Sequence, residues 1–339
     1  MNDEQIKRLK HILNTRQNII IIPHKNPDGD AMGSTLGLCH FLTKLGHKAK
    51  VVVPNDYPDF LKWLPGSEEV IIHELNTKHS TSTIEKADLI FTLDFNALHR
   101  AGHSLEKILN NADTRKIMID HHQQPEDYAE ITYSDVTIAS TCEMVYNVIE
   151  YLGEVSKLDA SIATCLYTGI MTDTGSFKFS STSSRTHFIV GKLMESGISH
   201  AEIHQNVFDS NSYERLQLLG RALQNLKIIP EYRTAYITLS QSELDEFKFR
   251  KGDTEGFVNY GLSIKGIIFA AIFIENEQEQ IIKISLRSKG TFSVNAFSRA
   301  HFNGGGHNNA AGGRSELSLD STIEKFISIL PEYQKDLAQ

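Results

Sequence analysis

The chain has 339 residues, and at about 100–200 residues per domain that length suggests two domains, or three small ones. Hydrophobic residues make up 40% of the chain and charged residues 22%, so it can bury a sizeable core and is not disordered throughout. Its 34 Lys and Arg against 42 Asp and Glu give a net charge of −8, which argues against a broad basic face for long nucleic acid but not against a small anionic substrate held locally.

Short apolar runs predict buried strands in the first half of the chain. Residues 19–22 are four isoleucines that end at Pro23, and such a run is too short for a helix. Similar runs recur further along, at 51–53, 89–93 and 116–119. Helical patterns lie between or after them, at 33–45, 159–172 and 184–196. This alternation predicts an α/β fold in which a doubly wound parallel sheet has helices on both faces.

The second half begins after a polar, helix-compatible segment at 199–229, which we expect to be a helical linker because Pro230 ends it. Two apolar runs separated by a polar turn, at 267–274 and 280–286, predict a β-hairpin. A strand, a glycine-rich segment and a final helix complete the expected pattern, at 234–239, 304–313 and 321–330.

These boundaries predict a first domain at 1–198, the linker at 199–229, and a smaller α+β domain at 230–339.

The cysteines and the apolar stretches bear on the cellular compartment. Cys39, Cys142 and Cys165 are scattered without a CxxC pair, which argues against a disulfide framework and against a thiolate zinc site. Residues 1–17 lack the apolar core of a signal peptide, and 267–274 is too short to span a membrane. We therefore expect a cytoplasmic protein that does not associate with a membrane.

A histidine and two aspartates follow the first predicted strand within one short turn. His24, Asp28 and Asp30 lie within seven residues, and Pro27 and Gly29 force an irregular backbone that can direct all three side chains to one point. Imidazole and carboxylate ligands favour Mn²⁺, with Mg²⁺, Co²⁺ and Zn²⁺ as competitors. The alternative for Asp30 is a simple helix N-cap.

Further acids and histidines end other predicted elements. Asp94 follows the strand at 89–93, and the triplet Asp120-His121-His122 follows the strand at 116–119. Asp173 ends a predicted helix, where the helix dipole disfavours a carboxylate and a cation would compensate.

Ligands of parallel sheets bind at the carboxyl ends of the strands, so we expect these groups to converge on one edge. Two metal ions about 3.5–4 Å apart could lower the pKa of a bridging water and clamp phosphate oxygens, which is what hydrolysis of a phosphate ester requires. Asp94 is the expected bridging carboxylate.

The combination of these motifs resembles that of the DHH phosphoesterase superfamily, which is named for the triplet Asp120-His121-His122. Its four N-terminal motifs appear in order, as His24-xxx-Asp28-x-Asp30, Asp94, the triplet itself, and Thr172-Asp173-Thr174-Gly175. The segment 304–312 resembles the signature of the DHHA1 substrate-binding domain. The resemblance implies that 1–198 is the catalytic domain and that 230–339 binds substrate, with the catalytic cleft between the two domains. The resemblance covers almost the whole chain, and the domain pattern and length are those of bacterial members that act both as oligoribonucleases and as phosphatases of 3′-phosphoadenosine 5′-phosphate (pAp).

The resemblance implies roles for the predicted site residues. One metal ion would be held by His24, Asp28 and Asp94, and the other by Asp30, Asp94, His121 and Asp173. His122 would donate a hydrogen bond or a proton to the substrate phosphate. Asp120 would orient a histidine from behind the ligands.

Substrate contacts are expected from the second domain. Arg287 ends an apolar run, and its planar fork suits bidentate contacts to phosphate. Gly305 and Gly306 would let backbone N–H groups approach a phosphate beside His307, and we expect a helix to start near Asn308. The alternative for this segment is an ordinary flexible turn.

Further candidates for substrate binding lie in the first half. Lys178 and Arg185 are interleaved with hydroxyls and with Phe177 and Phe179, whose rings could stack on bases or instead plug the core. Arg100, just after Asp94, is a candidate phosphate contact, with surface pairing as its alternative.

We therefore expect a phosphoesterase with two divalent ions, Mn²⁺ first, that hydrolyses short RNA oligonucleotides to mononucleotides and pAp to AMP through a hydroxide bridging the metals. The first alternative keeps the centre but changes the substrate to a cyclic or linear dinucleotide, pyrophosphate or polyphosphate. The second is a nucleotide-binding module without activity. The residues do not decide the metal, the direction of degradation or the oligomeric state, for which a homodimer is one option.

Overall fold

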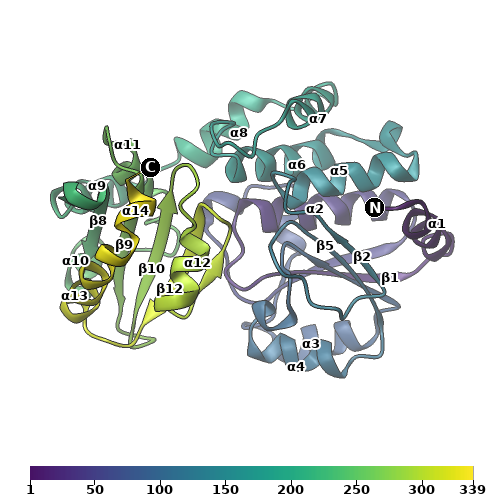
Figure 1. The fold of residues 1–339 in the computed structure, drawn as a ribbon. Helices are drawn as coiled ribbons and strands as arrows, with labels where there is room; N and C mark the ends of the chain where they lie inside the picture. Colours follow the sequence, from purple (N-terminus) through teal and green to yellow (C-terminus); the bar gives the residue numbers. More distant parts are fainter. Residues whose placement is uncertain (339) are drawn as a thin grey trace. The chain divides into compact units, whose positions relative to one another are not determined.

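The computed structural model describes residues 1–338, which form two compact units, 1–210 and 211–338. Each unit contains one six-stranded sheet (Figure 1). The two units meet in the chain between Ser210 and Asn211, inside the segment in which we expected a helical linker. Among the described residues, no helix is both long enough and apolar enough to span a membrane.

The sheet of the first unit is entirely parallel. Its strands lie in the order β3-β2-β1-β4-β5-β6. They are β1 (Asn18–Pro23), β2 (Lys48–Val53), β3 (Ile71–Ile72), β4 (Leu89–Leu93), β5 (Arg115–Asp120) and β6 (Ile131–Ser134). The chain therefore adds strands outward from β1 on one side and from β4 on the other, which confirms the predicted doubly wound sheet. In such a sheet the ligand crevice lies at the carboxyl ends of the two central strands, here β1 and β4.

Helices cover both faces of this sheet. Neighbouring residues of β1 point to opposite faces, so both faces are apolar and each needs a covering layer. Ile19 and Ile21 pack into the larger core and Ile20 and Ile22 into the smaller one. The larger core lies under α1 (Asp3–Ile12), α2 (Gly29–Lys44), α5 (Thr141–Leu152), α6 (Ala160–Asp173), α7 (Ser184–Met194) and α8 (His200–Phe208). The smaller core lies under α3 (Thr77–Glu85) and α4 (His103–Asn111).

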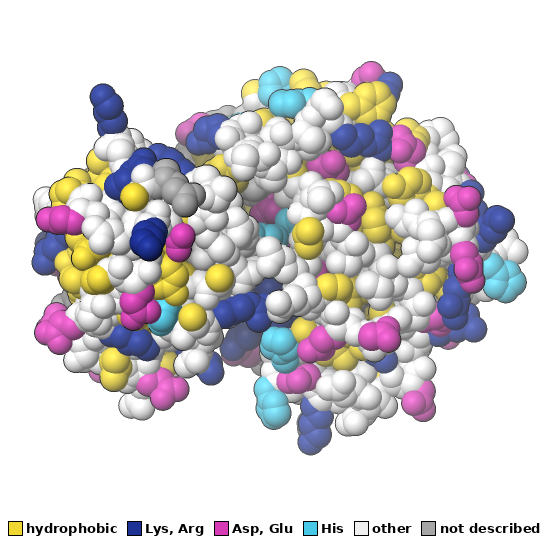
Figure 2. All heavy atoms as spheres, viewed as in Figure 1, with side chains coloured by type: hydrophobic (Ala, Val, Ile, Leu, Met, Phe, Trp, Pro, Cys, Tyr) yellow, Lys and Arg dark blue, Asp and Glu magenta, His cyan; other side chains and the backbone are white. Residues whose placement is uncertain are grey.

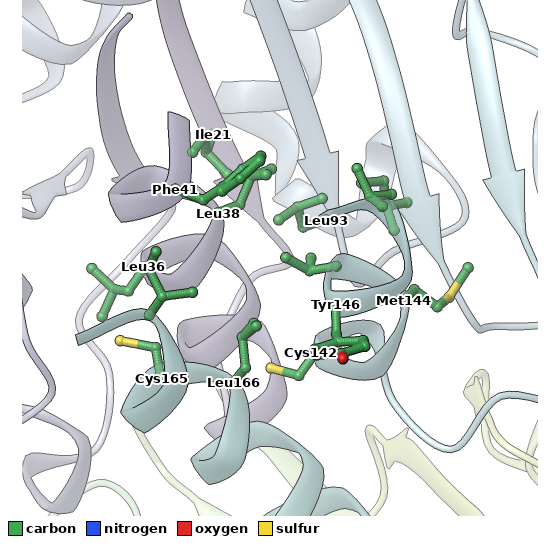
Figure 3. Close-up of a cluster of buried hydrophobic side chains, with 14 of the residues drawn as sticks. Ile21, Leu36, Leu38, Phe41, Leu93, Cys142, Met144, Tyr146, Cys165 and Leu166 are labelled. Carbon is green, nitrogen blue, oxygen red and sulfur yellow. The ribbon is translucent and has the colours of Figure 1, made fainter. Parts of the chain in front are cut away.

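Helices α2 and α6 approach each other closely because α2 presents a glycine every fourth residue. A Cβ at Gly33 would lie 2.4 Å from the carbonyl oxygen of Cys165, and a Cβ at Gly29 would lie 2.3 Å from Oγ1 of Thr172. Figure 3 shows side chains of these helices, of α5 and of the central strands packed in the core that results. This packing holds the amino end of α2 beside the carboxyl end of α6, and both ends carry predicted metal ligands.

The second unit has a mixed sheet in the order β11-β12-β10-β9-β8-β7, in which only the β8–β9 pair is parallel. Its strands are β7 (Lys227–Ile229), β8 (Thr234–Leu239), β9 (Phe269–Asn276), β10 (Ile281–Ser288), β11 (Gly305–Gly306) and β12 (Ala310–Ser315). The antiparallel pair of β9 and β10 confirms the predicted hairpin.

Helices cover both faces of this sheet. One face packs against α9 (Tyr213–Gln224), α10 (Gln241–Glu246) and α11 (Phe257–Ser263). The other face packs against α12 (Val294–His301), α13 (Leu319–Ile329) and the terminal α14 (Gln334–Leu337). This arrangement confirms an α/β first unit followed by a smaller α+β unit.

Candidate metal centre

The first group of the centre is His24, which follows β1 directly and is 8% exposed. Its Nδ1–H donates to the carbonyl oxygen of Lys25 at 2.8 Å, so Nε2 faces the acids. Nε2 lies 3.4 Å from Oδ2 of Asp94 and 3.9 Å from Oδ2 of Asp28.

The turn after His24 is held by a pair of asparagines. Asn26 has a positive φ of 57°, its N–H donates to Oδ1 of Asn55 at 2.8 Å, and Nδ2 of Asn55 donates back to Oδ1 of Asn26 at 2.8 Å. Asn55 follows β2, so the neighbouring strand fixes the turn that carries His24 and Asp28.

Asp28 and Asp30 occupy the start of α2 and play different parts. Asp28 is the N-cap, and its Oδ1 accepts the N–H groups of Asp30 and Ala31 at 3.1 and 3.0 Å. This leaves Oδ2 of Asp28 on the His24 side. Asp30 is therefore not the cap; it lies in the first turn, and its side chain is 1% exposed.

Asp94 lies at the middle of the cluster, at the end of β4. It has a positive φ of 65°, a conformation that Asp and Asn tolerate better than most residues and that aims the side chain across the sheet edge. Its Oδ2 lies 3.4 Å from Nε2 of His24, and its Oδ1 lies 3.5 Å from Nε2 of His121. One carboxylate thus faces two imidazoles on opposite sides.

The two histidines of the triplet are oriented by different groups. Nδ1–H of His121 donates to the carbonyl oxygen of Ile138 at 3.1 Å, so its Nε2 faces the acids. Nε2 lies 3.7 Å from Oδ2 of Asp30 and 3.4 Å from Oδ2 of Asp173, the last residue of α6. His122 turns the other way, and its Nδ1 lies 2.7 Å from Oδ1 of Asp120.

Sequence reasoning missed the amino end of α5, which binds two of the acids. The N–H groups of Thr141 and Cys142 donate to the two carboxylate oxygens of Asp30 at 2.6 and 2.9 Å. The Thr141 hydroxyl donates to Oδ1 of Asp94 at 3.0 Å. Ser140 caps the helix through the N–H of Glu143, and this Ser-x-x-Glu start of an apolar run was a signal that could have been found.

Burial and hydrogen bonds to histidines together set the pKa values of these acids apart. Burial raises the pKa of Asp30 well above its ordinary value, and the charges of Asp94 and Asp173 add to the effect. Burial acts on Asp94 in the same direction, but hydrogen bonds from His121 and His24 outweigh it and hold its pKa well below the ordinary value. Burial also raises the pKa of Asp120 to about 7.

The histidines show the complementary pattern. Burial would lower the pKa of His121, but Asp94 and Asp173 outweigh it and raise the pKa well above its ordinary value. The pKa of His24 is raised for the same reason, mainly by Asp94. Burial and the positive charge of Arg100 lower the pKa of His122 well below its ordinary value, so it is neutral.

The donor set fits two divalent cations. Ligand atoms of His24, Asp28 and Asp94 lie within 4.8 Å of one another, and so do those of Asp30, Asp94 and His121. Among the described residues, no Lys or Arg forms an ion pair with Asp30 or Asp94, which are 1% and 2% exposed. Buried carboxylates that lack a Lys or Arg partner require protons, protonated histidines or metal ions. The two ligand sets share Asp94.

Of the other residues predicted in this unit, Arg100 acts on the centre through its charge. Its carbonyl oxygen accepts the N–H of Lys25 at 2.7 Å, and its charge acts on His24 and His122. Arg185 points elsewhere: its Nη2 donates to Oε2 of Glu150 at 2.5 Å and to Oδ1 of Asn147 at 2.8 Å.

The loop after Asp173 divides its two phenylalanines. Phe177 packs its ring 6.0 Å from that of Tyr167, in the core, whereas Phe179 is 44% exposed. Lys178 between them is exposed.

In the second unit the predicted residues lie on adjacent strands. Arg287 of β10 is opposite Ala310 of β12, and Gly305 and Gly306 form β11 beside β12. His307 follows β11 and exchanges backbone hydrogen bonds with Ala310. The helix expected near Asn308 is wrong: the chain turns there and enters β12, whose backbone groups pair with those of β10.

The sequence matches two families in succession. Residues 18–170 match the DHH family, N-terminal domain, and residues 233–336 match the DHHA1 domain. The chain is 30% identical over 320 residues to the bifunctional oligoribonuclease and PAP phosphatase NrnA of Thermus thermophilus, covering 93% of this chain and 89% of that protein.

Two other relatives carry different names. The chain is 26% identical to the cyclic-di-AMP phosphodiesterase GdpP of Bacillus subtilis, covering 96% of this chain and 49% of that protein. It is 40% identical to a crystal structure described as an exopolyphosphatase-related protein from Bacteroides fragilis, with a TM-score of 0.94 over 100% of this chain and 98% of that chain.

Proposed function

The chain belongs to the DHH family of metal-dependent phosphoesterases, and from that premise we propose that it hydrolyses short RNA oligonucleotides to mononucleotides and pAp to AMP. The observation that carries the proposal is the position of Asp94, whose two carboxylate oxygens face His24 on one side and His121 on the other. A carboxylate shared in this way suits a pair of divalent ions acting on one phosphate.

In this proposal His24, Asp28 and Asp94 hold one ion. Asp30, Asp94, His121 and Asp173 hold the other. Two such ions, Mn²⁺ first, would supply a nucleophile at neutral pH and neutralise charge on the attacked phosphate.

The side chains around these ligands fix them in place. Nδ1 of His24 and of His121 each donates to a backbone carbonyl, which orients Nε2 of each ring for coordination. The amino end of α5 orients Asp30, and the Thr141 hydroxyl orients Asp94.

Asp120 and His122 form a pair that can move one proton. Asp120 is fully buried, which raises its pKa, and its Oδ1 lies 2.7 Å from Nδ1 of His122, so a proton can pass between the two side chains. We assign this pair to protonation of the leaving oxygen. His122 donates a proton to that oxygen, and Asp120 replaces it by giving its own proton to Nδ1 of His122. Arg100, whose charge reaches His122, would bind a phosphate oxygen beside it.

In the second unit, Arg287 and the Gly305–Gly306–His307 segment would bind the substrate's remaining phosphate, through the guanidinium group and through close approach of the phosphate to the glycine backbone. Lys178 and Arg185 remain predictions for substrate binding, and the pairing of Arg185 with Glu150 gives it a structural role as well.

The test is release of mononucleotides from the dinucleotide pApA, and of phosphate from pAp, by the purified protein with added Mn²⁺. We expect turnover of both substrates and none with chelator. Turnover of neither substrate with any divalent metal would contradict the proposal.

A second candidate keeps the centre and changes the substrate. The relatives named for cyclic-di-AMP and for exopolyphosphatase favour cyclic dinucleotides and polyphosphate respectively. Assaying these two compounds beside pApA and pAp decides between the candidates, because kcat/KM ranks the substrates directly.

A further inference from the structure

One face of the second sheet is covered over only part of its width. On this face Ala270 and Ile272 of β9 are 1% exposed beneath the helices α9 to α11. Directly opposed residues of paired strands point to the same side, so Arg287 and Ser285 of β10, which oppose these two, share that face. Yet β10 and β12 stay open there: Lys283, Gly312 and Arg314 are exposed, and Ser285, Arg287 and Ala310 are half-buried.

We call this open part the β10–β12 face. It comprises Lys283, Ser285, Arg287, Gly305, Gly312 and Arg314.

Two glycines on this face are not required by the fold. A Cβ at Gly312 would meet nothing nearer than 3.8 Å, and one at Gly305 nothing nearer than 3.6 Å. By contrast, a Cβ at Gly304 would lie 1.9 Å from the carbonyl oxygen of Gly312, and Gly306 has a positive φ of 144°. A strand glycine without a packing reason suggests that something approaches the backbone closely.

These two glycines form a bare strip across the face. Gly305 is opposite Gly312, which is opposite Ser285, so three neighbouring strands present no bulky side chain in this row. A strip of exposed peptide planes can take a flat nucleobase.

Cations border the strip on three sides. Arg287 lies two residues along β10 on one side, and the cross-strand pair Lys283 and Arg314 lies two residues along on the other. At the sheet edge, Nη2 of Arg299 lies 3.6 Å from where a Gly305 Cβ would be, and its Nε donates to Asn295 at 2.9 Å. Successive same-face positions on a strand are roughly 6.8 Å apart, a spacing similar to that of successive phosphates in an extended oligonucleotide.

The charge reverses at the far end of the same strands. Lys283 is paired with Glu279 at 3.7 Å, and Glu316 follows β12 directly. A surface depression there is lined by Glu275, Glu277 and Glu316 together with polar residues. A phosphate arriving at this acidic end would be repelled.

We propose that the β10–β12 face binds the nucleotides of an RNA substrate beyond the one being removed, and that the acidic end limits how long that RNA can be. The inference rests on the proposed function, because Arg287 and the glycine-rich segment mark the end at which the reacting nucleotide is held. A base lies on the bare glycine strip, the next phosphate is bound by Arg314 and Lys283, and a further phosphate meets Glu279 and Glu316. A substrate as small as pAp does not reach these last residues.

The test compares kcat/KM for pAp and for RNAs of graded length in the full-length protein with Mn²⁺. Arg314→Glu should lower kcat/KM for RNAs longer than a dinucleotide by about tenfold and reduce the salt slope of their binding, while pAp turnover stays unchanged. Gly312→Val should have the same length-dependent effect by blocking the strip. The double variant Glu279→Lys, Glu316→Lys should move the optimum to longer RNA.

Matched controls carry the same charge changes elsewhere on the second unit. Lys227→Glu lies on the exposed edge strand β7, and Glu324→Lys is exposed on α13. Neither should alter the dependence on length.

An equal loss of kcat/KM for pAp and for long RNA in Arg314→Glu would overturn the inference. So would an unchanged optimum of RNA length in the double variant Glu279→Lys, Glu316→Lys. Fluorescence anisotropy of labelled RNAs in chelator, with the unmodified protein and with the variants, separates this failure from failure of the proposed function. If the protein cleaves no RNA but RNA binding still depends on Arg314 and Glu316, the proposed function is wrong and the inference about the β10–β12 face is supported. If RNA binding depends on neither residue, the inference about the face is wrong, whether or not the protein is active.

Discussion

The metal centre of the first unit and the β10–β12 face of the second differ in how far their charges are removed from water. Asp30, Asp94 and Asp120 are at most 2% exposed, whereas Lys283 and Arg314 lie in solvent. In Figure 2, Lys and Arg side chains are interspersed with Asp and Glu over the visible surface, without a broad basic track. Buried charges act strongly on few partners, and exposed charges are screened, so changes in the centre should abolish activity while changes on the face should only tune it.

The largest effect should follow from Asp94→Asn. Asn suits the positive φ of this position, so the backbone is kept while the shared carboxylate is lost. We expect kcat/KM to fall by at least about a thousandfold for pAp and RNA alike, since metal ions contribute several kcal/mol to transition-state stabilisation. Steady-state kinetics and the Mn²⁺ content of the purified variant provide the measurement.

An exposed acid offers the control for Asp94→Asn: Asp113→Asn changes the same charge in the loop before β5 and should leave both readouts unchanged. Retained activity in Asp94→Asn would exclude a two-metal centre built around this residue.

The sequence predicted some residues of the centre and missed others. The proposed ligands His24, Asp94 and His121 each follow a short apolar run, and because the carboxyl ends of parallel strands share one edge, their convergence could be inferred without coordinates. Thr141 was missed because its hydroxyl reaches Asp94 only once α5 has packed against α2, a tertiary contact that no local pattern encodes.

In the second unit the sequence was less informative. The helix expected at Asn308 was wrong because pairing with β10 outweighs the local glycine-rich pattern. The openness of the face around Gly312 depends on which strands α11 leaves uncovered, and that is a property of the assembled sheet.

Removing the metals should have the next largest effect, and only the first unit should respond. The clustered carboxylates of Asp30, Asp94 and Asp173 repel one another, so ions that bind only the folded state stabilise it by about 4 kcal/mol at a thousand times Kd. Calorimetry with Mn²⁺ or with chelator should show a shift of the unfolding transition of the first unit alone. An identical shift in Asp94→Asn would contradict this origin.

A smaller effect should follow from Thr141→Val, which keeps the shape of the side chain and removes the hydroxyl that orients Asp94. Loss of a group that positions a metal ligand typically costs about tenfold to a hundredfold in metal affinity. Isothermal titration with Mn²⁺ measures this directly, apart from activity. Thr141→Ser retains the hydroxyl and should bind Mn²⁺ as the unmodified protein does; equal affinity in Thr141→Val would show that the backbone N–H groups of α5 position the acids alone.

The smallest effect concerns Glu143, a buried acid beside the centre that no proposed step uses. It is 3% exposed, and burial raises its pKa above the ordinary 4.5 despite a hydrogen bond from the Thr186 hydroxyl at 2.9 Å. Between the unfolded and folded pKa values the folded state binds more protons, so this carboxyl lowers stability as pH rises through that interval. Glu143→Gln keeps the acceptor for Thr186 and should be more stable than the unmodified protein at neutral pH, with an advantage that shrinks toward pH 4.5.

The midpoints of urea unfolding across this pH range measure that advantage. The exposed Glu316→Gln serves as control because surface substitutions of this kind usually change stability by no more than about 0.5 kcal/mol. An advantage of Glu143→Gln that persists at pH 4.5 would mean that burial of charge is not its cause.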